Sequence, residues 1–267
     1  DGLDPEAVAA AAVEVRAAGL RPRAIYDVPD FNNPLGTSLP LAARRRLLEV
    51  ARDEGLLVFE DSPYRMFAYD GPPLPTLKSL DEPGGVVVYL GSFSKTLFPG
   101  LRLGYLVAEQ AVEAADGCLA EALSPVKSLL TVNTPAPMQA AAGGLLGDSG
   151  GSLQAQVDEK IPFYRRNRDA MLAALEESFG RVGLGDRVSW NRPAGGFFLT
   201  VELPFEFDEE CVAEAAEKSG VIVCPMSFFA LSPGRERQIR LSFSYVSPEE
   251  IAEGVRRLAE FVAARLR

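Results

Sequence analysis

Short apolar runs alternate with longer segments of helical periodicity through the first half of the chain, and this alternation is the strongest constraint on its fold. Val86 to Leu90 is a continuous, β-branched run of the kind found in strands that are covered on both faces. Similar runs at Arg23 to Val28 and Leu56 to Glu60 flank Pro40 to Glu54, where apolar residues recur at helical spacing. Strands that alternate with helices predict an α/β fold with a mostly parallel sheet flanked by helices.

The pattern changes after Phe179. Before it, we expect helices at Gln110 to Leu123 and Leu153 to Phe179. After it, shorter strands are interleaved with helices, which predicts a smaller α+β domain. These strands are expected at Val188 to Trp190, Phe197 to Leu203, Val221 to Cys224 and Gln238 to Phe243. We therefore divide the chain into a large domain at 1–165 and a small C-terminal domain at 166–267, which includes part of the long interdomain helix.

The composition argues against several classes of partner. A formal charge of −10 disfavours a nucleic-acid-binding surface, because phosphate binding depends on clustered positive charge. No run approaches the roughly 20 apolar residues of a membrane span, and no basic-then-apolar segment opens the chain. We therefore expect a cytoplasmic protein with neither a nucleic acid nor a membrane as its partner.

The chain contains no histidine. This removes Ser-His-Asp hydrolysis, Cys-His proteolysis and histidine-ligated metals together. The three cysteines have no metal-type spacing, so we expect reduced thiols and no metal site. Lysine is scarce and occurs only at Lys78, Lys95, Lys127, Lys160 and Lys218. A lysine in an apolar setting is therefore a candidate for chemistry.

One of these lysines, Lys95, follows the end of the Val86 to Leu90 run. In open α/β sheets ligands bind at the carboxyl ends of the strands, so Lys95 lies where a small-molecule site is expected. Hydroxyls at Ser92 and Ser94, with the charge of Arg102, supply what a bound phosphate needs. An isolated loop lysine is usually solvated, so the interpretation depends on the surrounding pattern.

A second pair of polar residues, Asp61 and Tyr64, follows the Leu56 to Glu60 run. Taken alone, they are typical of a solvated loop acid and a half-buried tyrosine. A carboxylate in this position could instead keep a pyridine nitrogen protonated, which makes such a ring an electron sink. The Tyr64 hydroxyl could then hydrogen-bond an oxygen on the same ring.

Two further pieces of sequence carry Asn33 and Arg240. Asn33 lies in an Asn-Pro-x-Gly turn, and its side chain could also donate to that ring oxygen. Arg240 interrupts an apolar strand of the smaller domain, where an arginine is more often a snorkelling edge residue. If it faces a ligand, its planar fork would hold a carboxylate with two hydrogen bonds.

In their order and spacing, these four pieces resemble the fold-type I pyridoxal-phosphate-dependent aminotransferases of class I/II. The branch that they resemble includes the 2-aminoadipate and kynurenine aminotransferases. The specific signal is Ser-x-Ser-Lys with an arginine seven residues after the lysine, inside a Pro-Gly-x-Arg-x-Gly frame. Asn-Pro-x-Gly and Asp-x-x-Tyr are individually weak. The resemblance covers essentially the whole chain, including Pro193 to Phe198.

The resemblance implies a role for each candidate residue. Lys95, Asp61 and Tyr64 would be catalytic, with Lys95 forming a Schiff base to pyridoxal 5'-phosphate and Asp61 pairing with its pyridine nitrogen. The cofactor would be bound by Asn33, Asp61, Tyr64, Ser92, Ser94, Lys95 and Arg102. Arg240, with Asn33, would bind the α-carboxylate of the substrate.

The implied reaction moves an amino group from an α-amino acid to a 2-oxo acid. The family also implies a homodimer, because its active sites lie between two subunits. The match begins well inside the family's large domain, so the resemblance implies that this domain is incomplete and lacks its N-terminal portion. Two alternatives stay open: lyase, racemase or decarboxylase chemistry with the same cofactor, and a ligand-sensing domain of a transcription regulator.

Overall fold

The computed structural model describes residues 2–112 and 117–267, which divide into two compact units. Unit 1 consists of Asp1–Asp30, Thr37–Met66 and Pro72–Asp158. Unit 2 consists of Phe31–Gly36, Phe67–Gly71 and Glu159–Arg267. Two short loops from the first half of the sequence therefore belong to unit 2. The domain boundary expected at 165/166 lies within the last segment of unit 2, and stays a prediction about the domains.

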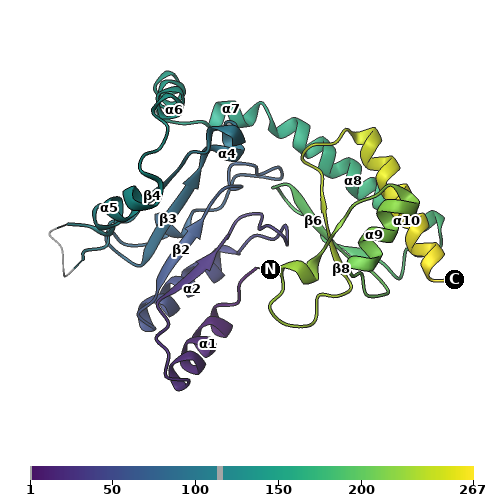
Figure 1. The fold of residues 1–267 in the computed structure, drawn as a ribbon, viewed down its shortest axis with the longest axis horizontal. Coiled ribbons are helices and arrows are strands. Elements are labelled where there is room, and N and C mark those ends of the chain that lie inside the picture. The colour runs from purple at the N-terminus through teal and green to yellow at the C-terminus, as the bar shows by residue number, and fades with distance from the viewer. Residues whose placement is uncertain (1, 113–116) are drawn as a thin grey trace. The chain divides into compact units, whose positions relative to one another are not determined.

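Unit 1 is built on a four-stranded sheet in the order β1-β2-β3-β4 (Figure 1). The strands are β1 (Ala24–Asp27), β2 (Leu57–Asp61), β3 (Val87–Ser92) and β4 (Gly104–Val107). The first three are parallel and β4 is antiparallel to β3, which confirms the predicted α/β class with a mostly parallel sheet. Asp27 pairs with Glu60 and Glu60 with Tyr89, so the carboxyl ends of the parallel strands lie along one edge.

The core of unit 1 lies between this sheet and the helices α1 (Pro5–Ala17) and α2 (Leu41–Asp53). One face of α2 is buried because its apolar side chains recur at helical spacing. The cluster includes Ile25, Leu47, Leu48, Ala51, Val58, Leu77 and Val87. The strand β1 alternates between exposed and buried residues, so its second face does not belong to this core.

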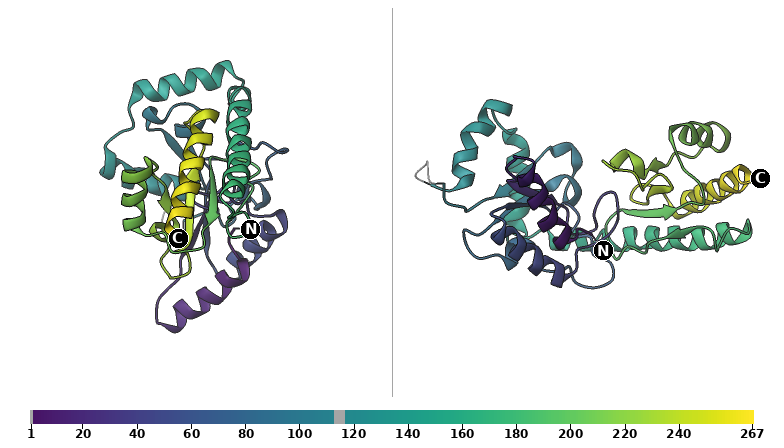
Figure 2. Two further views of the ribbon diagram at one scale, coloured as in Figure 1. Left: turned by 90° about the vertical axis from the view of Figure 1, so that its right-hand side faces the viewer. Right: turned by 90° about the horizontal axis from the view of Figure 1, so that it is seen from below.

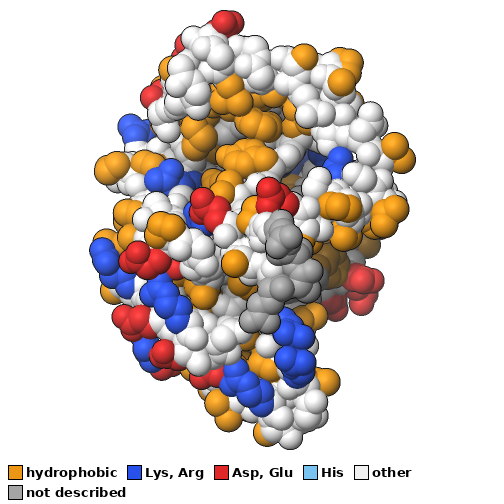
Figure 3. Space-filling model, turned by 90° about the vertical axis from the view of Figure 1, so that its left-hand side faces the viewer, with side chains coloured by type: hydrophobic (Ala, Val, Ile, Leu, Met, Phe, Trp, Pro, Cys, Tyr) orange, Lys and Arg blue, Asp and Glu red, His pale blue; other side chains and the backbone are white. Residues whose placement is uncertain are grey.

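Three helices follow β4: α5 (Leu119–Thr131), α6 (Ala136–Asp148) and α7 (Gln154–Asp158). No residue of α5 is buried, and all four residues of β4 are exposed. Figure 3 shows the molecule from the side of these elements, and hydrophobic side chains are exposed on that face. Unit 1 therefore carries apolar surface that is open in the isolated chain.

The helix expected at Gln110 to Leu123 is wrong in its first part. Residues 113–116 lie outside the described part of the chain. Ala111 forms a β-bridge with Cys118, and α5 begins only at Leu119. The Cys118 N–H donates to the Glu121 carboxylate at 2.8 Å, an arrangement that caps the start of a helix. The capping contact, and not the apolar spacing, therefore sets where this helix starts.

Unit 2 contains a second four-stranded sheet, in the order β5-β6-β8-β7, with antiparallel pairing throughout. The strands are β5 (Ser189–Trp190), β6 (Phe198–Glu202), β7 (Cys224–Pro225) and β8 (Gln238–Ser242). The helices α8 (Ile161–Arg181) and α10 (Pro248–Arg265) run side by side, and α9 (Glu209–Ser219) precedes β7 (Figure 2). This arrangement confirms the predicted α+β character of the C-terminal part.

Two expected elements of this part differ from the structure. The strand expected at Val221 to Cys224 is paired only at Cys224–Pro225, and the Ile222 side chain is 81% exposed. The helix expected at Leu153 to Phe179 is split into α7 and α8. Pro162 lies in the first turn of α8, where its missing N–H breaks no helical hydrogen bond, so a new helix begins there.

Candidate functional site

The carboxyl ends of β2 and β3 bring two of the predicted motifs to the same edge of the sheet. β2 ends at Asp61, which pairs in register with Leu90, and β3 ends two residues later at Ser92. Because the two strands are parallel neighbours, the residues that follow them emerge on one side. Tyr64 lies three residues beyond Asp61, and its side chain is buried, with 6% exposed.

Lys95 lies in the short helix α4 (Phe93–Thr96), which follows β3 directly. Ser92 is the residue before this helix, and its hydroxyl oxygen accepts a hydrogen bond from the Ser94 N–H at 3.2 Å. This contact fixes the turn out of the strand. The Lys95 side chain is exposed, as a lysine that receives a ligand must be.

Arg102 is held close to α4 along the chain. The Phe93 N–H donates to the carbonyl of Leu103 at 3.1 Å, which ties the start of α4 to the residue after Arg102. Between them lies the 3-10 turn η1 (Pro99–Leu101). Arg102 has a φ of +51°, in the left-handed region, which costs a non-glycine residue about 1 to 2 kcal/mol. Its exposed guanidinium donates to the Pro99 carbonyl at 3.2 Å and has further N–H groups to offer.

Asp61 has a partner that the sequence did not indicate. The Tyr26 hydroxyl donates to Asp61 Oδ2 at 2.5 Å. Burial raises the pKa of Tyr26, and the hydrogen bond to Asp61 raises it further. Tyr26 is an ordinary strand residue in the sequence, and no signal there marks it, because its contact depends on how β1 and β2 are paired.

A cavity of about 530 Å³ opens beside these residues in unit 1. It is lined by the loop after β2, by β3, α4 and β4, and by residues between α6 and the start of α7. The lining includes Ser62, Pro63, Tyr89, Ser92, Phe93, Thr96, Tyr105 and Leu153. The candidate residue Ser92 is among the described residues that line this cavity, whereas the candidates Lys95, Asp61 and Arg102 are not. The Ser62 hydroxyl is buried and has no hydrogen-bond partner within the described part of the chain.

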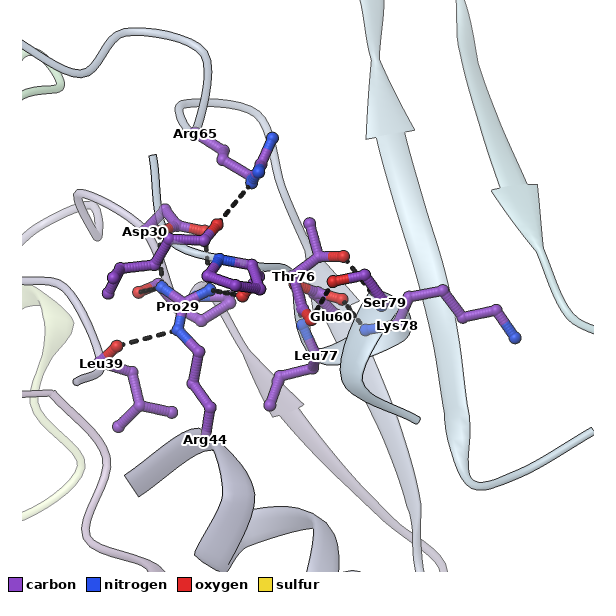
Figure 4. A network of polar contacts seen from close by, with 12 residues as sticks. Pro29, Asp30, Leu39, Arg44, Glu60, Arg65, Thr76, Leu77, Lys78 and Ser79 are labelled. Carbon is purple, nitrogen blue, oxygen red and sulfur yellow. Dashed lines mark hydrogen bonds and ion pairs between the residues drawn. The ribbon is translucent and has the colours of Figure 1, made fainter. Parts of the chain in front are cut away.

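A buried polar network supports this edge of the sheet (Figure 4). Arg44 of α2 is completely buried and donates to both carboxylate oxygens of Asp30, at 2.5 and 3.2 Å. It also donates to the carbonyls of Pro29, Leu39 and Pro75. Because these acceptors lie in loops on both sides of the helix, Arg44 joins the loop after β1 to the loop before α3 (Leu77–Leu80).

Glu60 is the third charged residue of this network, and its side chain is completely buried. Its two oxygens accept from the backbone N–H groups of Leu77 and Lys78, at 2.9 and 2.8 Å. Burial raises the pKa of Glu60, and these two donors act in the opposite direction. The sequence shows only an acid at the end of a strand, so this structural role was missed.

Asn33 and Arg240 both belong to unit 2 and contact each other. Arg240 Nη1 donates to Asn33 Oδ1 at 2.7 Å. The guanidinium of Arg240 lies 4.6 Å from the ring centre of Phe198 and 5.1 Å from that of Phe229. Arg240 Nε is buried and has no hydrogen-bond partner among the described residues. The guanidinium therefore contacts two aromatic rings, and Arg240 lies on β8, which is not an edge strand of this sheet.

The loop that carries Asn33 is fixed by its glycine. Gly36 has a φ of +66°, and a Cβ at this position would lie 2.3 Å from the Phe198 carbonyl oxygen. The side-chain amide of Asn191 also donates to the Leu35 carbonyl at 2.7 Å. Close approach to β6 therefore requires glycine here, which gives the weak Asn-Pro-x-Gly motif a physical reason.

The candidate residues thus form two groups. Unit 1 holds Asp61, Tyr64, Ser92, Ser94, Lys95 and Arg102, and unit 2 holds Asn33 and Arg240. In the part of the chain that the structure describes, no group of three or more acidic or cysteine side chains could hold a metal ion. None of the helices in residues 2–112 and 117–267 is long and apolar enough to cross a lipid bilayer.

Comparison with known proteins decides the family. The model of the aminotransferase class I and II family matches residues 23–258, which is most of the chain. The chain belongs to this family. The match includes β1 to β4 and the strands of the second sheet, so it covers all the candidate residues in both units.

Individual members are similar over the whole chain. It is 46% identical over 267 residues to the (S)-3,5-dihydroxyphenylglycine transaminase of Amycolatopsis orientalis, and spans 59% of that enzyme's length. A kynurenine aminotransferase of Pyrococcus horikoshii, solved in complex with PMP, is 34% identical with a TM-score of 0.85. The similarity covers 98% of this chain and 61% of that one.

Transcription regulators are also among the relatives. The chain is 34% identical over 228 residues to the HTH-type transcriptional regulator TauR of Rhodobacter capsulatus. That similarity covers 85% of this chain and 44% of the regulator. The identity to the transaminase of Amycolatopsis orientalis is higher, and it extends over the full chain.

Proposed function

We propose that the protein carrying this chain is a pyridoxal-phosphate-dependent aminotransferase, which moves an amino group from an α-amino acid to a 2-oxo acid. One observation carries the proposal. Lys95 lies in α4, between Ser92 and Arg102 in the sequence, at the sheet edge where the neighbouring strand ends in Asp61. A nucleophilic amine, phosphate donors and a carboxylate therefore occur at one edge of one sheet.

The donors in unit 1 fit this cofactor. Ser92 and Ser94 have hydroxyl groups and Arg102 has a guanidinium fork, and such groups bind a phosphate with charge-assisted hydrogen bonds. Asp61 is bonded through one oxygen to Tyr26, which leaves the other as an acceptor for a ring nitrogen. The kynurenine aminotransferase that resembles this chain was solved with PMP, which supports the same cofactor here.

Each candidate residue of unit 1 would have a separate role in the reaction. The cofactor, when bound, supplies an electron sink for the bonds at the substrate's α carbon. Lys95 would hold the cofactor through its amine and, once that amine is released, would move a proton at the substrate's α carbon. Asp61 would hold the proton on the ring nitrogen, and Tyr64 would donate to the ring oxygen.

Unit 2 would supply the substrate contact. Arg240 is a planar cation whose guanidinium lies over the rings of both Phe198 and Phe229. Its edge would bind the α-carboxylate with two hydrogen bonds. Asn33 accepts from Arg240 through its amide oxygen, so its NH₂ group can donate to the cofactor's ring oxygen.

The assembly and the location are part of the same proposal. Leu129, Leu130 and Val132 are 88%, 79% and 82% exposed, and contiguous apolar surface of this kind marks an interaction site. A second copy of the chain, in a homodimer, is the partner that we propose for it. The expected partners otherwise are amino acids and 2-oxo acids, and the expected location is the cytoplasm.

An absorbance titration tests the function. The whole protein, loaded with pyridoxal 5'-phosphate, is titrated with a panel of amino acids, and the products are analysed. We expect at least one amino acid to bleach the cofactor band while a 2-oxo acid and the aminated cofactor appear together. Carbon dioxide or an elimination product without the aminated cofactor would indicate lyase or decarboxylase chemistry. No spectral change across the panel would favour the ligand-sensing alternative.

A further inference from the structure

Tyr26 and Asp61 are brought together by the pairing of β1 with β2. Tyr26 is in register with Phe59, so the two side chains leave the sheet on the same face. Asp61 lies two residues further along β2 and therefore on that face as well. A diagonal neighbour on a sheet is within reach of a long aromatic side chain, and the observed hydroxyl-to-Oδ2 distance is 2.5 Å.

The ring of Tyr26 does not explain why a tyrosine occurs at this position. Its side chain is 63% exposed, whereas the neighbouring Ile25 belongs to the core cluster on the opposite face. Tyr26 therefore contributes little to the packing of unit 1. Its hydrogen bond to Asp61 is the contact in which a tyrosine differs from a phenylalanine.

The phenol is suited to hold a carboxylate without neutralising it. A tyrosine hydroxyl donates as a neutral group, so Asp61 keeps its charge for another partner. Partial burial of the hydroxyl and its hydrogen bond to Asp61 raise the pKa of Tyr26, so the hydroxyl remains a donor well above neutral pH. By contrast, an arginine at this distance would compete with a ring nitrogen for the carboxylate.

We propose that Tyr26 is a positioning residue for Asp61: it holds Oδ2, and thereby presents Oδ1 to the ring nitrogen of the cofactor. This inference rests on the proposed function. Without the hydroxyl, the carboxylate can rotate, and its alignment with the nitrogen has to be gained when the cofactor binds. Removal of the Tyr26 hydroxyl should therefore lower the affinity of the protein for the cofactor.

The first test is the Tyr26→Phe variant of the whole protein. We expect its dissociation constant for pyridoxal 5'-phosphate, measured by equilibrium dialysis, to rise about 3- to 30-fold. The melting temperature of the cofactor-free protein should not change, because the ring and its few contacts remain. Tyr245→Phe is the matched control: its side chain is 94% exposed, and the affinity should stay at the wild-type value.

The second test asks whether Tyr26 acts through Asp61 and the ring nitrogen. It uses a cofactor analogue in which a carbon replaces the ring nitrogen, and the Asp61→Asn background with the natural cofactor. In both cases Tyr26→Phe should have no further effect on the dissociation constant. An equal loss of affinity with the analogue, or in the Asp61→Asn background, would overturn the proposal.

The positioning role of Tyr26 and the proposed function can fail separately. If the wild-type protein binds the cofactor and transaminates, but Tyr26→Phe binds the cofactor equally well, the positioning role is wrong and the proposed function stands. If the wild-type protein does not bind the cofactor, the proposed function fails and the role of Tyr26 fails with it.

Discussion

Two sets of charged residues lie at the same edge of the sheet in unit 1, and they differ in burial and in the number of their partners. In the buried network, Arg44, Asp30 and Glu60 are between 0% and 2% exposed, and each is paired with opposite charge or backbone groups. At the candidate site, Lys95 and Arg102 are exposed. A buried charge needs a full set of partners, whereas an exposed one can keep its capacity for a ligand.

The difference indicates which residues build the site and which act in it. Arg44 and Glu60 join the loops that surround the carboxyl ends of β1 and β2. They are committed to protein atoms and have little left to offer a ligand. Lys95 and Arg102 depend on that framework for position but contribute little to it. Stability and activity should therefore respond to different substitutions.

The largest expected effect is the loss of activity in Lys95→Ala. We expect turnover to fall by about 1000-fold or more, because no other amine can attach the cofactor at this position. The free energy of unfolding, measured by denaturant titration, should change by about 0.5 kcal/mol or less, because the side chain is exposed. Lys218→Ala, an exposed lysine of unit 2, serves as the control. A marked loss of stability in Lys95→Ala would show that Lys95 stabilises the fold in the way that Arg44 and Glu60 do.

The second effect is the loss of stability in Arg44→Met. Removal of the guanidinium leaves the buried Asp30 carboxylate without its counter-charge, which should lower the free energy of unfolding by about 3 to 5 kcal/mol. Arg46→Met, on the same helix, removes exposed pairs with Glu6 and Glu49 and should cost about 1 kcal/mol or less. An equal loss of unfolding free energy in Arg44→Met and Arg46→Met would contradict the distinction between buried and exposed charged residues.

A smaller effect extends the comparison to unit 2. Arg240→Lys keeps the charge but loses the planar fork and its contacts with the rings of Phe198 and Phe229. We expect KM for the amino acid to rise about 10- to 100-fold, with a smaller change in kcat. Steady-state kinetics measures both, and Arg235→Lys in the same unit is the control. An unchanged KM would show that the carboxylate is bound elsewhere.

The smallest effect is a pH dependence that comes from Glu60. Burial raises the pKa of Glu60 above its ordinary value of 4.5, so the folded state holds a proton that the unfolded state has lost. The contribution of Glu60 to stability should therefore be full below pH 4.5 and decline as the pH rises through the folded pKa. Relative to Glu60→Gln, the wild type should lose stability over that range in denaturation curves. A difference that is constant with pH, or of opposite sign, would contradict this assignment.

Two strands of unit 1, β2 and β3, could be predicted from sequence because each is a short, continuous run of mostly apolar residues. Val86 to Leu90 became β3, and Leu56 to Glu60 became β2, each within about two residues of the prediction. Helix starts were harder. A capping contact at Cys118 marks the start of α5, and Pro162 marks the start of α8. The spacing of apolar residues indicates neither start.

The candidate site could be predicted only where it follows a strand end. Lys95 and Asp61 were placed correctly at the carboxyl ends of β3 and β2 because that position depends on sequence order alone. Tyr26, Arg44 and Glu60 were missed, since their partners depend on strand pairing and on loops distant in sequence. The roles of the candidate residues stay predictions until they are tested.

The most direct test of the account is to find which lysine carries the cofactor. The whole protein is loaded with pyridoxal 5'-phosphate, reduced with borohydride to make the link permanent, digested and analysed by mass spectrometry. The account predicts a single modified peptide, with the cofactor on Lys95. Modification of Lys78, Lys127, Lys160 or Lys218 in its place, or no modified peptide at all, would contradict it.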